Sequence, residues 1–248
     1  IKGWLTEDAL LALGFDEEPN PALHKLIGKS FKVEARANID GIEITDEYIF
    51  NFEVGEGAID QAKAELKALA EEKIGQLPAH PAYKMGIEEK EITIKIEDKN
   101  TKVLALKNTG ALTILSSVEQ VRGYQVLGEG FPYRSFYDED GNRIPDNTIK
   151  GWLTEDALLA LGFDEESNPA LHKLIGKSFK VEARGNIDGI EITDEYIFNF
   201  EVGEGAIDQA KAELAGIAKE KSLQLNNIPE IKLDFIESNR LVRITIED

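Results

Sequence analysis

The chain has 248 residues, of which 42% are hydrophobic, so each of two modest domains could bury a core. It contains no cysteine, which excludes disulfides, thiolate metal sites and a cysteine nucleophile and fits a reducing compartment. The formal net charge of −19 favours solubility and repels polyanions at long range. No apolar run could span a bilayer and no signal-peptide pattern is present, so we expect no membrane partner and a cytoplasmic or virion-associated location.

The first predicted elements are two short helices. Thr6 is a favourable N-cap, acidic residues follow it in the first turn, and Gly14 ends this helix. Asn20 and Pro21 begin a second short helix, which Gly28 ends.

A hairpin, a helix and a strand come next. Residues 30–54 alternate apolar and charged side chains around an Asp-Gly pair at 40–41, which predicts a β-hairpin. Its return strand carries an aromatic stripe, Tyr48, Phe50 and Phe52, and a stripe at strand spacing is usually core. After a glycine-rich turn at 55–57 we expect a helix over 58–72 and an alternating strand within 91–98.

Residues 99–148 also favour strands. The segments 101–106, 111–115 and 117–127 are rich in apolar and β-branched side chains, and Phe136–Ile144 is typical of a further hairpin. A unit of five to seven strands and three helices would be α+β, as a small barrel or a curved sheet with added helices.

The chain contains a long internal repeat. Residues 1–73 return almost unchanged at 149–221, and 91–98 parallels 241–248. A repeat of this length indicates a duplicated domain. We therefore expect a tandem duplication of two homologous units with a repeat of about 150 residues. The first unit is 1–98, and the second is 99–248, made of a single-copy β segment, 99–148, and the duplicated part, 149–248.

The first unit lacks its N-terminal third, which leaves an open sheet edge if residues 99–148 supply strands. An open edge is an association hazard or a docking site. The edge could be completed by residues 99–148, by a segment upstream of Ile1, or by another molecule. Recent duplication, gene conversion or an engineered tandem fusion would each explain the near identity of the copies.

Catalytic and metal-binding constellations are missing from the sequence. The histidines are His24, its counterpart His172, and His80, which has no counterpart. A surface or half-buried position explains His24 and His172 better than a role as a base or a ligand. There is no HExxH, GxSxG or P-loop pattern, so we predict a non-enzymatic protein without a cofactor or metal. The glycine turns 55–57 and 203–205 each contain a glutamate, which would repel a bound phosphate, so a tight strand-to-helix turn explains them better. Residues 138–142 are better explained by a hairpin turn than by a calcium loop.

Aromatic and arginine side chains gather in the single-copy segment. Stacking on exposed aromatic rings beside cationic side chains is how proteins hold single-stranded nucleic acid. Phe131 adjoins this cluster, and the predicted nucleic-acid-binding residues are Arg122, Tyr124, Tyr133, Arg134, Phe136 and Tyr137.

The order of elements resembles that of phage-type single-stranded DNA-binding proteins. The resemblance lies in YDEDGNRIPD, GWLTEDALLALGFDEE and LIGKSFKVEARGNIDGIEITDEY, over about residues 120–200 and the matching part of the first copy. It implies two OB-like, β-barrel-like units that bind single-stranded nucleic acid. The net charge, the helix at 206–221 and the last strand depart from the family pattern.

A structural role is the alternative. In this hypothesis the chain is a tandem-repeat assembly protein of a virion, filament or surface, and strands of a neighbouring copy complete the open edge of 1–98. The divergent segments 67–98 and 215–248 would then set which neighbour is bound.

Overall fold

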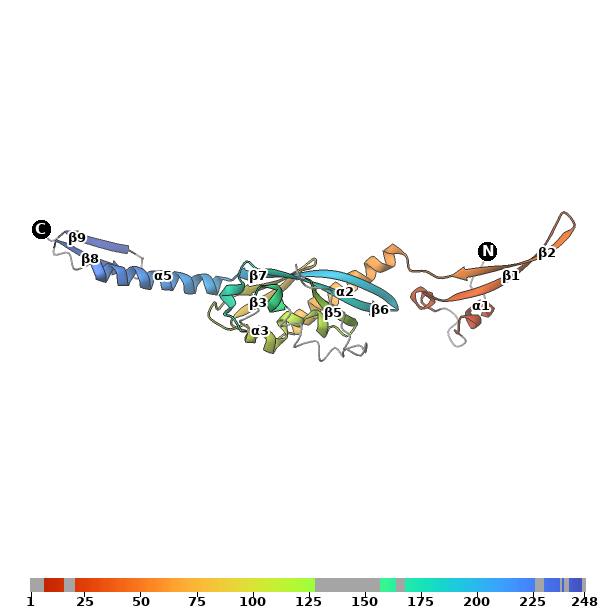
Figure 1. Ribbon diagram of the computed structural model, residues 1–248, viewed down its shortest axis with the longest axis horizontal. Helices are drawn as coiled ribbons and strands as arrows, with labels where there is room; N and C mark the ends of the chain where they lie inside the picture. Colours follow the sequence, from red (N-terminus) through yellow and green to blue (C-terminus); the bar gives the residue numbers. More distant parts are fainter. Residues whose placement is uncertain are drawn as a thin grey trace.

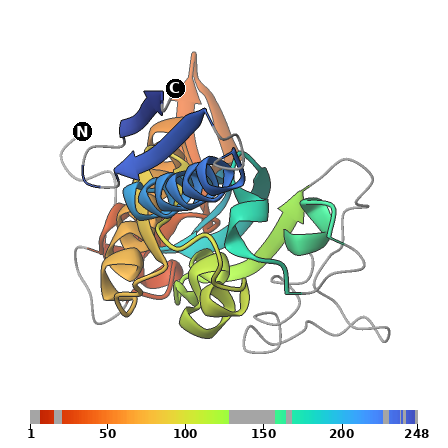
Figure 2. The same cartoon turned by 90° about the vertical axis from the view of Figure 1, so that its left-hand side faces the viewer.

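The computed structural model describes residues 7–15, 21–127, 157–163, 168–225, 230–236, 238 and 241–246, with only the backbone described at 116, 122–127 and 225. The molecule is elongated, with a central sheet between two projecting ends (Figure 1). A view along the long axis places the C-terminal helix and strands in front (Figure 2).

Helices and strands are mixed along the chain, which confirms the α+β class. The helices are α1 (Glu7–Ala12), α2 (Glu56–Gln76), α3 (Leu104–Thr109) and α5 (Glu204–Leu225), with 3-10 turns η1 (Leu23–Leu26), η2 (Ala111–Thr113), η3 (Leu115–Ser117) and η4 (Leu171–Leu174). The strands are β1 (Ser30–Ile39), β2 (Ile42–Asn51), β3 (Tyr83–Glu88), β4 (Glu91–Ile96), β5 (Val121–Leu127), β6 (Ser178–Ile187), β7 (Ile190–Val202), β8 (Ile231–Ile236) and β9 (Leu241–Ile246).

The central sheet has the order β3-β4-β7-β6-β5. All its pairs are antiparallel except β4 with β7, which run parallel. β1 pairs with β2, and β8 pairs with β9, as separate two-stranded sheets. The described strands thus form open sheets, and a closed OB-like barrel is not seen among the described residues.

The central sheet crosses the boundary between the two predicted units. β3 and β4 come from 1–98, whereas β5, β6 and β7 come from 99–248. The sequence left open whether residues 121–127 complete the first or the second unit. In the structure they pair with β6 of the second copy. Helix α2 of the first copy packs against β7, β6 and β3. One copy therefore supplies a helix and two strands to the hairpin of the other.

The two Asp-Gly hairpins form as predicted. Asp40 and Gly41 have φ of 53° and 85°, and Asp188 and Gly189 have 50° and 85°. Positive φ at both central residues defines the type I′ turn that suits a twisted hairpin. The predicted helix over 58–72 is confirmed within α2, and the predicted strand within 91–98 is confirmed as β4.

Two predicted strands are wrong. The segment 101–106 leads into α3, and 111–115 forms the turns η2 and η3. Gly110 ends α3 in the left-handed conformation, with φ of 77°. The apolar side chains of both segments, including Leu106, Leu112 and Leu115, are buried in the core. Short apolar runs can be buried equally well as helix or as strand, so the composition of these segments did not distinguish the two structures.

Candidate functional site

The hairpin β1–β2, here called the N-terminal hairpin, exposes a face that its counterpart buries. Residue n of the first copy corresponds to residue n+148 of the second copy, as far as Ile236 at the end of β8. Tyr48 and Phe50 are 54% and 47% exposed, whereas Tyr196 and Phe198 are fully buried at 0%. The core prediction for this stripe is therefore confirmed in the second copy and wrong for Tyr48 and Phe50. Other members of the exposed face are Val33, Ile39, Ile42 and Ile44, whose counterparts are buried.

The opposite end of the molecule shows the reverse asymmetry. We call α5, β8 and β9 the C-terminal arm, and α2, β3 and β4, their counterparts in the first copy, the inner arm. Leu66 of α2 is fully buried and Leu214 of α5 is 66% exposed. Residues 241–246 correspond to 91–96, and Ile94 is buried while Ile244 is 62% exposed. The hairpin face that is buried in the second copy is thus exposed in the first, and the arm residues that are buried in the first copy are exposed in the second.

Inside the chain, the inner arm contacts the β6–β7 hairpin of the second copy through β4. In the parallel β4–β7 pair, Ile92 lies opposite Phe198 and Ile94 opposite Phe200. At the end of β4, the N–H of Gly203 donates to the carbonyl of Ile96 at 2.8 Å. In the first turn of α5, the N–H of Gly205 donates to Oε2 of Glu97 at 2.8 Å.

The glycines of this turn are needed because the backbone of the inner arm comes so close. A Cβ on Gly203 would lie 2.8 Å from the Ile96 carbonyl oxygen, and one on Gly205 would lie 2.6 Å from that of Glu97. At Gly55 and Gly57, their counterparts, a Cβ would meet nothing within 4 Å. The tight strand-to-helix turn predicted at 203–205 is confirmed. Its Gly203 N–H donates to the Ile96 carbonyl and its Gly205 N–H to the Glu97 carboxylate of the same chain.

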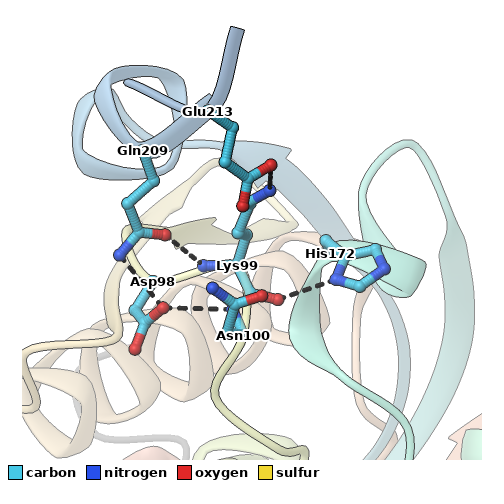
Figure 3. A network of polar contacts seen from close by, with 6 residues as sticks. All are labelled: Asp98, Lys99, Asn100, His172, Gln209 and Glu213. Carbon is cyan, nitrogen blue, oxygen red and sulfur yellow. Dashed lines mark hydrogen bonds and ion pairs between the residues drawn. The ribbon is translucent and has the colours of Figure 1, made fainter. Parts of the chain in front are cut away.

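A polar network continues beyond β4 (Figure 3). The Lys99 N–H donates to Gln209 at 3.0 Å, and the Gln209 amide donates to Asp98 at 3.1 Å. The Lys99 ammonium pairs with Glu213, and the backbone carbonyl oxygen of Lys99 lies 2.8 Å from Nδ1 of His172. These contacts tie the end of the inner arm to α5 and to η4.

The first-copy counterparts of this network line an open cavity. His24, Gln61 and Glu65 correspond to His172, Gln209 and Glu213. They line a cavity of about 670 Å³. Ile187 and Ile190, at the tip of the β6–β7 hairpin, line its far side. The space that residues 96–99 fill in the second copy is open in the first.

The corresponding groove of the second copy is smaller and apolar. It holds about 340 Å³ and is lined by Lys99, His172, Ile175, Val202, Ala206, Ile207, Ala210, Lys211 and Leu214. No hairpin tip lines it among the described residues.

Several ionisable groups have shifted pKa values. The Gly205 N–H and the Lys84 ammonium hold the pKa of Glu97 below its usual value. Hydrogen bonds from Thr101 and from the Asn100 N–H lower the pKa of Asp98. Burial, reinforced by the nearby Asp194 charge, raises the pKa of Tyr196.

Two buried side chains of the core, Asp194 and Tyr196, have incompletely satisfied polar atoms. Lys90 pairs with Oδ1 of Asp194. Among the described residues, Oδ2 of Asp194 and the hydroxyl of Tyr196 have no hydrogen-bond partner.

Burial also raises the pKa of Glu182, and Glu195 across the strand pair adds to this shift.

The predicted nucleic-acid-binding residues are scarcely described. Arg122 and Tyr124 lie in β5, with only their backbone described. Tyr133, Arg134, Phe136 and Tyr137 lie outside the described residues, as does the candidate calcium loop at 138–142. Whether these side chains form one surface stays a prediction.

The predicted surface or half-buried positions of His24 and His172 are confirmed. His24 and His80 are half-buried and His172 is exposed. Within the described ranges, no group of three or more histidines and carboxylates is placed to hold a metal ion. Among the same residues, no helix is both long and apolar enough to cross a membrane.

The comparisons with known proteins leave the family open. No family model, no curated protein and no solved structure matches this chain.

Proposed function

We propose that this protein is a structural assembly protein whose molecules associate head to tail through the N-terminal hairpin and the C-terminal arm. The observation that carries the proposal is the unequal burial of equal sequences. The same hairpin face is covered in the second copy and open in the first, and the same helix face is covered in α2 and open in α5. Each open surface is thus complementary to the other.

The energetic reason is the area of apolar surface left in water. An isolated two-stranded hairpin is marginal in water, and contiguous exposed apolar patches mark interaction sites. Burial of a large apolar side chain contributes about 1.5–3 kcal/mol. Several such side chains lie on each open surface, among them Ile44, Tyr48, Phe50, Leu214 and Ile244.

The two surfaces lie at opposite ends of the long axis (Figure 1). A contact between unlike surfaces at opposite ends is heterologous, and it produces chains or rings rather than closed dimers. A filament or shell component would use such a contact.

The test is the molar mass as a function of protein concentration, measured by sedimentation equilibrium. We expect mass to rise continuously with concentration. Leu214→Glu places a charge on the open face of α5 and should return the protein to a monomer. A constant monomer mass at all concentrations would refute the proposal.

The chain offers a matched control for this variant. Ala212 and its counterpart Ala64 are both exposed, so position 212 faces solvent even where the arm is packed. Ala212→Glu adds the same charge two residues away and should leave the association unchanged.

Binding of single-stranded nucleic acid through OB-like units stays a separate prediction, because the side chains that would carry it are not described. A thymine oligonucleotide added to the same samples tests it. Salt-sensitive binding would support that function, since neutralised phosphates release counterions. Association that ignores the oligonucleotide would favour the assembly role alone.

A further inference from the structure

We infer that β9 of one molecule adds to the free edge of β2 in the next molecule, in the register of β4 and β7, and that the tip of that N-terminal hairpin docks beside His172 of the first. This inference rests on the proposed function and specifies its interface. The occupant of both surfaces is a second copy of this chain.

The register follows from the pair already formed within the chain. β4 lies parallel to β7, with Glu91 opposite Ile197 and Ile96 opposite Val202. Transferred to the counterpart residues, the register places Leu241 and Val242 opposite Ile49 and Phe50 of β2. It places Ile244 and Ile246 opposite Phe52 and Val54, which directly follow the end of β2 at Asn51. Ile244 and Ile246 are exposed, and so are Phe50 and Val54.

Both strands have an edge free to pair. In the described residues β2 pairs with β1 and β9 with β8, each on one side. Their counterparts β7 and β4 are interior strands, flanked on both sides. Unpaired N–H and C=O groups along an edge are a template for an added strand.

The glycine turn of the first copy has room for the arriving strand. A Cβ on Gly55 would meet nothing within 4 Å, whereas one on Gly203 would lie 2.8 Å from the carbonyl of Ile96. In the inferred register, the carbonyl of Ile246 takes the place of that of Ile96. Gly55 therefore supplies the close approach that Gly203 supplies inside the chain.

The hairpin tip has a matching groove. Ile187 and Ile190 line the cavity beside His24, Ile27 and Ala58. The counterparts of those three residues, His172, Ile175 and Ala206, line the 340 Å³ groove of the second copy. Ile39 and Ile42, the counterparts of the tip residues, are both more than half exposed. Docking of the neighbour's tip would cover the groove and these two side chains together.

The absence of cysteine makes disulfide trapping a direct test. Thr245 lies opposite Glu53 in the inferred register, as Lys95 lies opposite Glu201. We would mix protein carrying Thr245→Cys with protein carrying Glu53→Cys under mild oxidation and measure covalent dimers. Neighbouring strands lie about 4.8 Å apart, and disulfides join Cα atoms closer than about 7 Å. We expect the mixture to form disulfide-linked dimers and each protein alone to form few.

Glu47→Cys is the register control. Glu47 lies in β2, six residues before Glu53, and their counterparts Glu195 and Glu201 share one face of β7. At roughly 3.3 Å per residue, Glu47 is about 20 Å from Glu53 along the chain. It should not trap Thr245→Cys. Trapping at Glu47 but not at Glu53, or dimers of Thr245→Cys alone, would overturn the inferred register while leaving self-association intact. Mass that does not rise with concentration would refute the proposed function itself.

A second variant tests the interface without a disulfide. Gly55→Ser adds a Cβ where the strand must approach, and serine is also favoured at this N-cap position of α2. We expect unfolding of the monomer to be unchanged and association to weaken by about tenfold or more, as overpacking of a close contact does. Unchanged association would place β9 elsewhere and overturn the inference.

Discussion

The backbone N–H of Gly205 donates a 2.8 Å hydrogen bond to Oε2 of Glu97, so the first turn of α5 holds the end of the strand that the other copy supplies. Lys84, on β3 of the same arm, pairs with Oε1 of Glu97 at 3.0 Å. The carboxylate thus joins the inner arm to the hairpin it completes. Unfolding of the variants would be measured in dilute protein, where self-association is weakest.

The Glu97 contact predicts a dependence of stability on acid pH. Because the pKa of Glu97 is lowered in the folded protein, its contribution is present above the usual pKa of glutamate, about 4.3. It is lost as pH falls through the lower folded value. We expect Glu97→Gln to lower the thermal midpoint at neutral pH. Near a pH of about 2 to 3, roughly two units below the usual pKa of glutamate, the variant should match the wild type because the carboxylate is protonated. A difference that persists unchanged into acid would contradict this role.

The close approach at Gly205 predicts an asymmetric pair of variants. Gly205→Ala would place a Cβ 2.6 Å from the Glu97 carbonyl oxygen, and we expect it to lower the free energy of unfolding by about 1–3 kcal/mol. Gly57→Ala, at the equivalent open position in α2, should leave it unchanged or raise it by less than about 1 kcal/mol. Denaturant unfolding measures both, and equal effects would argue against the packing described at 203–205.

The two equivalent leucines predict a second asymmetry. Leu66 is buried in the core, so Leu66→Ala should cost about 2–5 kcal/mol of unfolding free energy. Leu214 is mostly exposed, and Leu214→Ala should change it by less than about 0.5 kcal/mol. If Leu214→Ala proved as costly in dilute protein, α5 would be covered in the monomer, and the open surface would not exist.

Tyr196 predicts a loss of stability in alkali. Its pKa is raised by burial and by Asp194, so its contribution is complete below the unfolded value of about 10 and is lost as pH rises toward the folded value. Tyr196→Phe removes a buried hydroxyl that has no partner among the described residues. We expect unchanged or slightly raised stability at pH 7, and a smaller loss above pH of about 10 than in the wild type. Tyr48→Phe, at the exposed counterpart, should leave the stability at pH 7 unchanged within about 0.5 kcal/mol.

The sequence by itself determined the local elements where the pattern is strong. The Asp-Gly turns at 40–41 and 188–189, the helix α2 and the alternating strand β4 follow from turn chemistry and periodicity, which act within a few residues. It did not determine the short apolar runs at 101–106 and 111–115, because burial satisfies them as helical turns or as strands.

Only the tertiary structure determined which of two equivalent side chains is buried against the other copy. Tyr48 and Tyr196, or Leu66 and Leu214, lie in nearly identical sequences and have the same local preferences, yet one of each pair is buried and the other exposed. Their burial depends on whether a partner segment lies within reach along the chain, and the inner arm reaches the hairpin of the second copy. No property of the residues themselves could distinguish them, because burial is a property of the contact and not of the side chain.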